Sequence, residues 1–173
     1  MPHEHLRYRD GYLDMSNPGR DEKTRLVDLT VAATSPMDAN GIALTAQVLP
    51  GMASGKPSTP ESLQVTVQID PRTVTLVAKD GLTTGQLDVL FVQHDKAGRS
   101  LDVLNHSINL ELGSTELVKI RRFGILFNKD LKRTKDAESL RVIVRDVDSG
   151  ATGSITIPFA QLVPAESVQP DAR

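Results

Sequence analysis

The segment Asp146 to Gly150, with the sequence DVDSG, is the part of the chain that comes closest to a metal-binding loop. Oxygen ligands at alternate positions followed by glycine are how a helix–loop–helix calcium site begins. Such a loop also needs glycine at its sixth position and glutamate at its twelfth, where this chain has Ala151 and Ile157. The segment lies between two β-patterned runs, and Asp, Ser and Gly are the residues that tight connections use. We therefore predict a hairpin or bulge turn, with a metal loop as the alternative.

Other residue types that could do chemistry are scattered. His3 and His5 fall in the polar amino-terminal stretch, whereas His94 and His106 flank a predicted hairpin at unequal distances from its centre, and neither pair has a third zinc ligand nearby in sequence. Asp14 to Pro18 contains only the first half of an Asp-x-Ser-x-Ser metal motif. The chain has no Gly-x-Ser-x-Gly and no glycine-rich phosphate loop between a strand and a helix. We therefore do not expect an enzyme, and the sequence names no catalytic, cofactor-binding or metal-ligating residue.

The composition argues against several classes of protein. The 173 residues include no cysteine, which excludes a disulfide framework and thiolate metal sites. The net charge is −2 and basic residues are interspersed with acidic ones, so we expect no nucleic-acid partner. The basic run Lys129 to Lys135 is interrupted by Asp130, and we interpret it as a solvated loop. No apolar run has the length of a membrane-spanning helix, and the first ten residues lack the apolar segment of a signal peptide.

Hydrophobic periodicity predicts a series of short β-strands. In the clearest run, residues 61–70, every second residue is apolar: Leu63, Val65, Val67 and Ile69. Residues 85–112 are typical of a hairpin that turns at Asp95 to Arg99, and its first strand is apolar on both faces, which predicts a central strand covered on both sides. Further strands are expected at 24–34, 42–50, 73–81, 139–146 and 153–159. A flexible loop is expected at Pro50 to Pro60, which contains three prolines and has no periodicity.

The hydrophobic period changes to that of a helix at residues 115–123. This segment follows Ser114, a residue suited to an N-cap, and precedes Gly124, a residue that ends helices. We expect Leu117, Ile120 and Phe127 to pack against the strands. Seven or eight short strands with one short helix predict an all-β fold, an immunoglobulin-like antiparallel β-sandwich.

The expected domain organisation has three parts. Residues 1–23 form an amino-terminal arm and linker, 24–162 the β-sandwich domain, and 163–173 a flexible tail. Within the arm, Leu6 to Leu13 has strand character, and we expect it to pack on the domain or to pair with another copy.

Four segments, taken together and in order, resemble the carboxy-terminal region of bacterial von Willebrand factor A (VWFA)-related domain proteins. They are SPMDANGIALTAQV, the stretch from Leu63 to Arg99, TELVKIRRFGILFNKDL, and LRVIVRDVDSGATGSITIP. LRYRDGY, near the amino terminus, resembles the motif that closes the A-type domain of those proteins. The resemblance implies an exported bacterial protein in which a metal-dependent adhesion domain precedes this one, so that the arm is a remnant of that domain. The metal motif itself is not in this chain, and no binding residue is carried over.

Fold pattern and resemblance together suggest a non-catalytic β-sandwich module that accompanies an A-type domain in protein–protein interaction or adhesion at the bacterial envelope. The expected partner is a cell-surface protein of unknown identity, no cofactor is expected, and the chain should be a monomer or a weak dimer. By resemblance, its location is secreted, periplasmic or at the cell envelope. The alternative is a glycan- or small-ligand-binding module, which the aromatic content of 3% disfavours because sugar-binding platforms need exposed aromatic rings.

Overall fold

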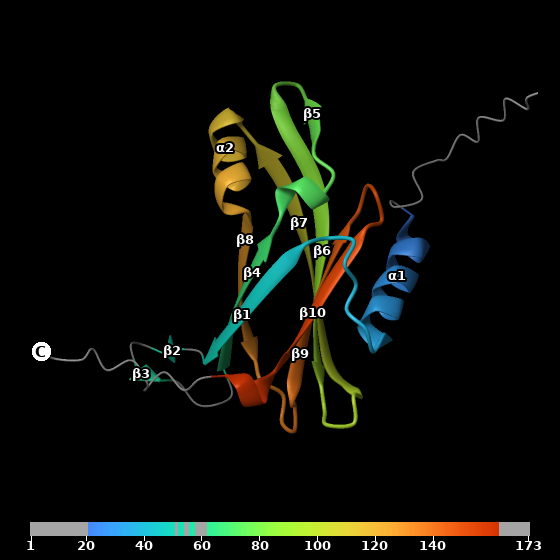
Figure 1. Ribbon diagram of the computed structural model, residues 1–173, viewed down its shortest axis with the longest axis vertical. Helices are drawn as coiled ribbons and strands as arrows, with labels where there is room; N and C mark the ends of the chain where they lie inside the picture. Colours follow the sequence, from blue (N-terminus) through green and yellow to red (C-terminus); the bar gives the residue numbers. More distant parts are fainter. Residues whose placement is uncertain (1–20, 51, 54–55, 58–61, 163–173) are drawn as a thin grey trace, which may run out of the picture.

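The computed structural model describes residues 21–50, 52–53, 56–57 and 62–162 (Figure 1). This part of the chain forms two antiparallel sheets and two short helices. The first sheet has the order β1-β4-β8, made of Leu44–Pro50, Ser62–Ile69 and Ile125–Lys132. The second has the order β10-β9-β6-β7, made of Thr152–Pro158, Ser139–Asp146, Leu82–His94 and Ser100–Leu112. The predicted antiparallel β-sandwich is confirmed.

The strand order is that of an immunoglobulin-like sandwich. If β1, β4, β6, β7, β8, β9 and β10 are taken as strands A, B, C, C′, E, F and G, the two sheets are A-B-E and G-F-C-C′. A short strand, β5 (Val77–Lys79), pairs with the start of β6 through the tight turn at Asp80 and Gly81, whose φ angles are 51° and 79°. The 3₁₀ turns η2 (Pro71–Thr73) and η3 (Phe159–Gln161) follow β4 and β10.

The core lies between the two sheets and is built by side chains that alternate along each strand. The predicted alternation of β4 is confirmed, because all four of its apolar side chains are buried: Leu63, Val65, Val67 and Ile69. Opposite them lie the inward-facing residues of β6 and β9: Leu87, Val89, Phe91, Leu140, Val142 and Val144. Every residue of β6 from Leu87 to His94 is buried, which confirms a central strand covered on both faces.

The first element is a helix, α1 (Glu22–Thr34), so the strand predicted at 24–34 and the expectation of a single helix are wrong. Asp21 caps the helix, because its carboxylate accepts hydrogen bonds from the Thr24 N–H at 3.0 Å and the Thr24 hydroxyl at 2.9 Å. In Figure 1 the helix lies outside the sandwich, against the face of the second sheet that points away from the core. There Leu29 and Ala32 pack on Leu90, Val92 and Ile143.

Strand β8 was not predicted, and the interpretation of Lys129 to Lys135 as a solvated loop is wrong for its first half. β8 continues to Lys132 and pairs with β4 along its whole length. Its inward positions are Ile125 and Leu131, which are buried, with Phe127 and Lys129 half-buried between them. A lysine on the inward face, Lys129, and a leucine on the exposed face, Leu126, obscured this two-residue period.

The second helix, α2 (Ser114–Phe123), confirms the helix predicted at 115–123. Its N-cap is Gly113 rather than Ser114, and Gly124 ends it with φ 82°. Ile120 packs against the core from this helix, and Phe127 does so from β8. Within the predicted loop at 50–60, Met52–Ala53 (β2) pairs with Lys56–Pro57 (β3). Residues 51, 54–55 and 58–60 of that loop, the arm up to residue 20, which includes Leu6 to Leu13, and the tail from 163 lie outside the described residues, whereas residues 22 and 23 of the expected arm belong to α1.

Candidate functional site

The segment Asp146 to Gly150 is a hairpin turn between β9 and β10, as predicted. The Asp146 carboxylate accepts hydrogen bonds from the N–H of Asp148 at 2.8 Å, of Ser149 at 3.2 Å, and of Thr75 in the neighbouring segment. Gly150 adopts φ 76°, and its N–H donates to the Asp146 carbonyl at 2.9 Å. Burial raises the pKa of the Asp146 carboxyl, but the backbone hydrogen bonds outweigh it and hold the pKa below its ordinary value of 3.8. Asp146 therefore organises the turn.

The two histidines that flank the β6–β7 hairpin are not brought together. His94 is buried opposite Ser100, and burial lowers the pKa of its imidazole below 6.5. His106 lies opposite Val89, and its ring is centred 5.1 Å from the ring of Phe127 on the other sheet. In the part of the chain that the structure describes, no three His, Asp or Glu side chains gather where they could hold a metal ion.

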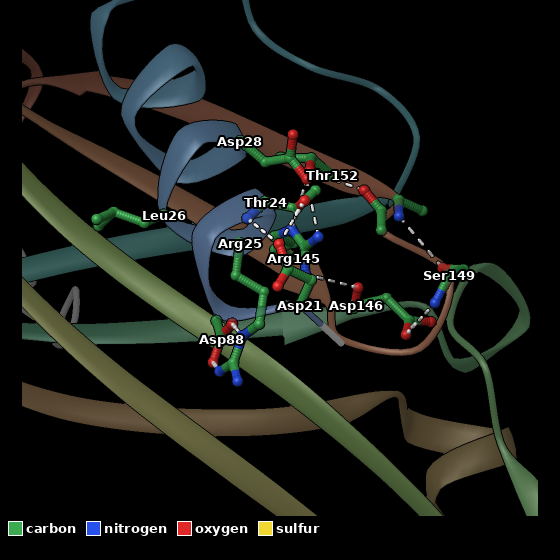
Figure 2. Close-up of polar contacts among 12 residues, drawn as sticks. Asp21, Thr24, Arg25, Leu26, Asp28, Asp88, Arg145, Asp146, Ser149 and Thr152 are labelled. Carbon is green, nitrogen blue, oxygen red and sulfur yellow. Dashed lines mark hydrogen bonds and ion pairs between the residues drawn. The ribbon is translucent and has the colours of Figure 1, made fainter. Parts of the chain in front are cut away.

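A cluster of buried charges, which the sequence did not reveal, fixes α1 to the second sheet (Figure 2). Asp88 on β6 is fully buried, and Arg25 of α1 binds it with two hydrogen bonds, from Nε at 3.0 Å and from Nη2 at 2.7 Å. The hydroxyl of Ser107 on β7 donates a third, at 2.8 Å. These three hydrogen bonds offset part of the cost of burying the Asp88 carboxyl group away from water.

The same cluster continues onto β9 through two more arginines. Arg145, fully buried and level with Asp88 in the sheet, donates to the Asp28 carboxylate of α1 at 3.0 and 2.8 Å. Arg141 donates to the carbonyl oxygens of Ala32 and Met37 and forms an ion pair with Asp38 at 3.1 Å. These ion pairs and hydrogen bonds therefore attach α1, and the chain that follows it, to the second sheet, which is a structural role.

The edges of the sandwich differ in how far they are protected against pairing with another strand. The start of the β10 edge is covered, because Asn40 forms a bridge with Gly153 and the segment 39–42 exchanges hydrogen bonds with Thr152 and Ser154. β8, at an edge of the first sheet, carries Lys129, Asp130 and Lys132, and charges of this kind oppose strand addition.

β7 lacks these protections. It is 13 residues long, and among the described residues it pairs with β6 alone. Between Asp102 and Glu111 the strand carries no acidic or basic side chain apart from His106, and it contains no proline. Val103 and Leu104, on opposite faces, are 54% and 37% exposed. A long, uncharged and exposed edge of this kind presents a row of backbone donors and acceptors to another chain.

A hollow of about 430 Å³ adjoins β7 on the outer face of the sheet. Its walls come from α1 (Glu22, Arg25, Leu26 and Leu29) and from the two strands beneath (Asp88 and Asn105). Leu26 is 68% exposed, and Figure 2 shows it pointing away from the ion pairs. We call the edge of β7 from Val103 to Leu110, together with this hollow, the β7 surface.

The sequence contains signals for α1 and for the β7 surface, but their interpretation requires knowing which distant residues they contact. Arg25, Asp28, Leu29 and Ala32 have the i, i+3, i+4, i+7 spacing of a helix face. Two of the four are charged, and their counter-ions lie 63 and 117 residues further along the chain. The absence of Lys, Arg and Pro from β7 is visible in the sequence, but its position at an edge is not.

Comparisons with known proteins identify no relative, so a function is inferred from the fold and from the geometry of its surfaces. No protein-family model matches the chain, and no curated protein matches its sequence. No helix in the described part of the chain is both long and apolar enough to cross a membrane.

Proposed function

We propose that this chain is a non-catalytic protein-interaction module and that the β7 surface is where a partner binds. A strand from the partner adds to the unpaired edge of β7, so that main-chain hydrogen bonds supply affinity and side-chain pockets supply specificity. The observation that carries the proposal is the contrast of β7 with two other edges: the start of β10 is covered and β8 is charged, whereas β7 is long, exposed and without Asp, Glu, Lys or Arg over Val103 to Leu110.

The charges of β7 favour a partner over a second copy. β7 carries two carboxylates, Asp102 and Glu111, and no Lys or Arg. Pairing of two copies through β7 would gather the carboxylates of both copies without a cation between them. A partner strand with Lys or Arg at its ends would instead place opposite charges beside Asp102 and Glu111, and such cross-strand pairs are favourable.

Two other classes of function have less support. A glycan platform needs a row of exposed aromatic rings, and among the described residues Phe123 is the one aromatic side chain among the exposed large hydrophobics. An enzyme needs converging reactive groups, and the buried carboxylate next to the hollow, Asp88, is fully engaged by Arg25 and Ser107.

The resemblance to VWFA-related proteins extends the proposal to a biological setting. We place the module next to an A-type domain in a protein exported to the bacterial envelope, where it contributes a second contact with a surface protein. Two weak contacts joined in one chain bind far more tightly than either alone.

A capture experiment tests the proposal. The chain is used as bait for an envelope fraction of the source organism, and compared with Val103→Lys/Asn105→Lys, which adds two charges to the exposed edge. The matched control is Leu126→Lys, a change at another exposed edge position, on β8. Circular dichroism verifies that all three proteins are folded.

We expect the wild type and Leu126→Lys to retain the same partner and the β7 variant to lose it. Equal capture by the β7 variant contradicts the proposal. If sedimentation instead shows that the wild type is a dimer and the β7 variant a monomer, the occupant is a second copy and the heterologous partner is ruled out.

A further inference from the structure

A groove of about 560 Å³ lies at the end of α2, separate from the β7 surface. It is bounded by the carboxyl end of α2, the turn η2, the start of β1 and the end of β4. Its volume is within the range of known ligand sites, about 300–1,000 Å³. The apolar side chains that line it include Leu44 and Pro71, which are half-buried, and Phe123, which is exposed.

The walls of the groove are held by contacts between distant parts of the chain. Gly124 ends α2 with φ 82°, and a side chain there would lie 3.1 Å from the carbonyl oxygen of Ile69. The amide of Gln68 donates to the carbonyl of Phe123 at 2.6 Å and fixes the helix end to β4. The groove is therefore preformed, which lowers the entropic cost of binding.

The charges on the groove are unbalanced. Three arginines line it, and one of them, Arg72, is neutralised by Asp70 at 2.6 Å. This ion pair holds the pKa of Asp70 at about 2, because Arg72 donates to its carboxylate from both side chain and backbone. Arg121 and Arg122 have no ion-pair partner among the described residues, and the guanidinium of Arg122 lies 5.1 Å from the ring centre of Phe123. Two cations thus stand beside an apolar surface.

We propose that this groove binds an acidic, extended peptide segment of a partner protein. Carboxylates of the peptide pair with Arg121 and Arg122, whose planar guanidinium groups suit carboxylate oxygens, and an intervening apolar side chain lies against Leu44, Pro71 and Phe123. The charge of the groove is opposite to that of β7, so the two surfaces select segments of opposite charge. The two proposals are therefore independent, and refuting one does not refute the other.

Nuclear magnetic resonance of the ¹⁵N-labelled full chain tests the inference. The probe is the capped peptide acetyl-Glu-Leu-Glu-Phe-amide, and its uncharged match is acetyl-Gln-Leu-Gln-Phe-amide. We expect saturable chemical-shift changes of the amides of Phe123, Gly124 and Arg72 with the Glu peptide. The Gln peptide should bind at least about tenfold more weakly. Raising the salt concentration should weaken the binding of the Glu peptide, because the two arginines are exposed.

Variants assign the effect to the two arginines. R121Q/R122Q should weaken binding about tenfold, whereas K119Q, which removes a cation of α2 that does not line the groove, should leave it unchanged. The inference is overturned if the two peptides bind equally, if the shifts lie elsewhere on the domain, if no saturable shift occurs, or if R121Q/R122Q binds like the wild type. Citrate serves as a further probe: shifts equal to those of the peptide would show a general anion site and overturn the peptide as occupant.

Discussion

Replacing Arg25 with methionine should destabilise the domain, because it leaves the buried Asp88 carboxylate without its cation. Asp88 is fully buried and accepts two hydrogen bonds from Arg25 and one from Ser107. Removing one partner of a buried ion pair costs about 3–5 kcal/mol. Arg25 is 25% exposed and the hollow beside it admits water, so we expect about 2–3 kcal/mol. With a urea m-value of about 2 kcal/mol/M, the midpoint of unfolding falls by about 1–1.5 M.

Two further variants make this prediction specific to the ion pair. Lys23→Met removes an exposed cation from the same helix and should change the free energy of unfolding by less than about 0.5 kcal/mol. Arg25→Met/Asp88→Leu replaces both charges with apolar groups and should recover stability to within about 1 kcal/mol of the wild type. The reasoning is refuted if Arg25→Met costs no more than Lys23→Met, or if the double variant is less stable than Arg25→Met.

Three further predictions concern the packing of β10, the pH dependence of stability and the turn at Asp146 to Gly150. Gly153→Ala should cost about 3 kcal/mol in urea unfolding, because its Cβ would lie 2.2 Å from the Ile42 carbonyl oxygen; a cost below about 0.5 kcal/mol contradicts this packing. The pKa of His94 is lowered in the folded state, so as pH drops the unfolded chain takes up the proton first, and the free energy of unfolding should fall below about pH 6.5. His94→Phe should flatten this pH dependence, and an unchanged slope in the variant would refute the prediction. Millimolar calcium or magnesium should leave the melting temperature unchanged, since the backbone saturates the Asp146 carboxylate, and a rise of several degrees that Asp148→Ala abolishes would overturn this.

The parts of the fold that could be predicted from the sequence are those with local, repeated signals. The alternation in β4 and the turn residues at Asp95 to Arg99 predicted a half-buried strand and a hairpin, and both are confirmed. The turn at Asp146 to Gly150 was predicted because it needs only Asp, Ser and Gly in order. None of these depends on the identity of a distant partner.

The parts that were missed depend on partners far away in sequence. α1 has β-branched and leucine residues on its exposed face, Leu26, Val27 and Val31, which favoured a strand. What holds it as a helix is the pairing of Arg25 and Asp28 with the buried Asp88 and Arg145, together with the burial of Leu29 and Ala32. The β7 surface was likewise hidden, because the edge position of a strand follows from non-local pairing and no local pattern reports it.

The most direct test of the central claim is amide hydrogen exchange along β7, measured by nuclear magnetic resonance on the chain alone and with a capped basic strand peptide, Lys-Val-Thr-Val-Thr-Thr-Val-Thr-Val-Lys, whose two lysines have the same nine-residue separation as Asp102 and Glu111. In the free chain, amides of Val103 to Leu110 that point toward β6 should be protected and those that point outward should exchange rapidly, so protection alternates along the strand. The peptide should slow the outward amides of β7 and leave those of β8 unchanged. Uniform protection of β7 in the free chain, or no change at β7 on addition of the peptide, would contradict the account.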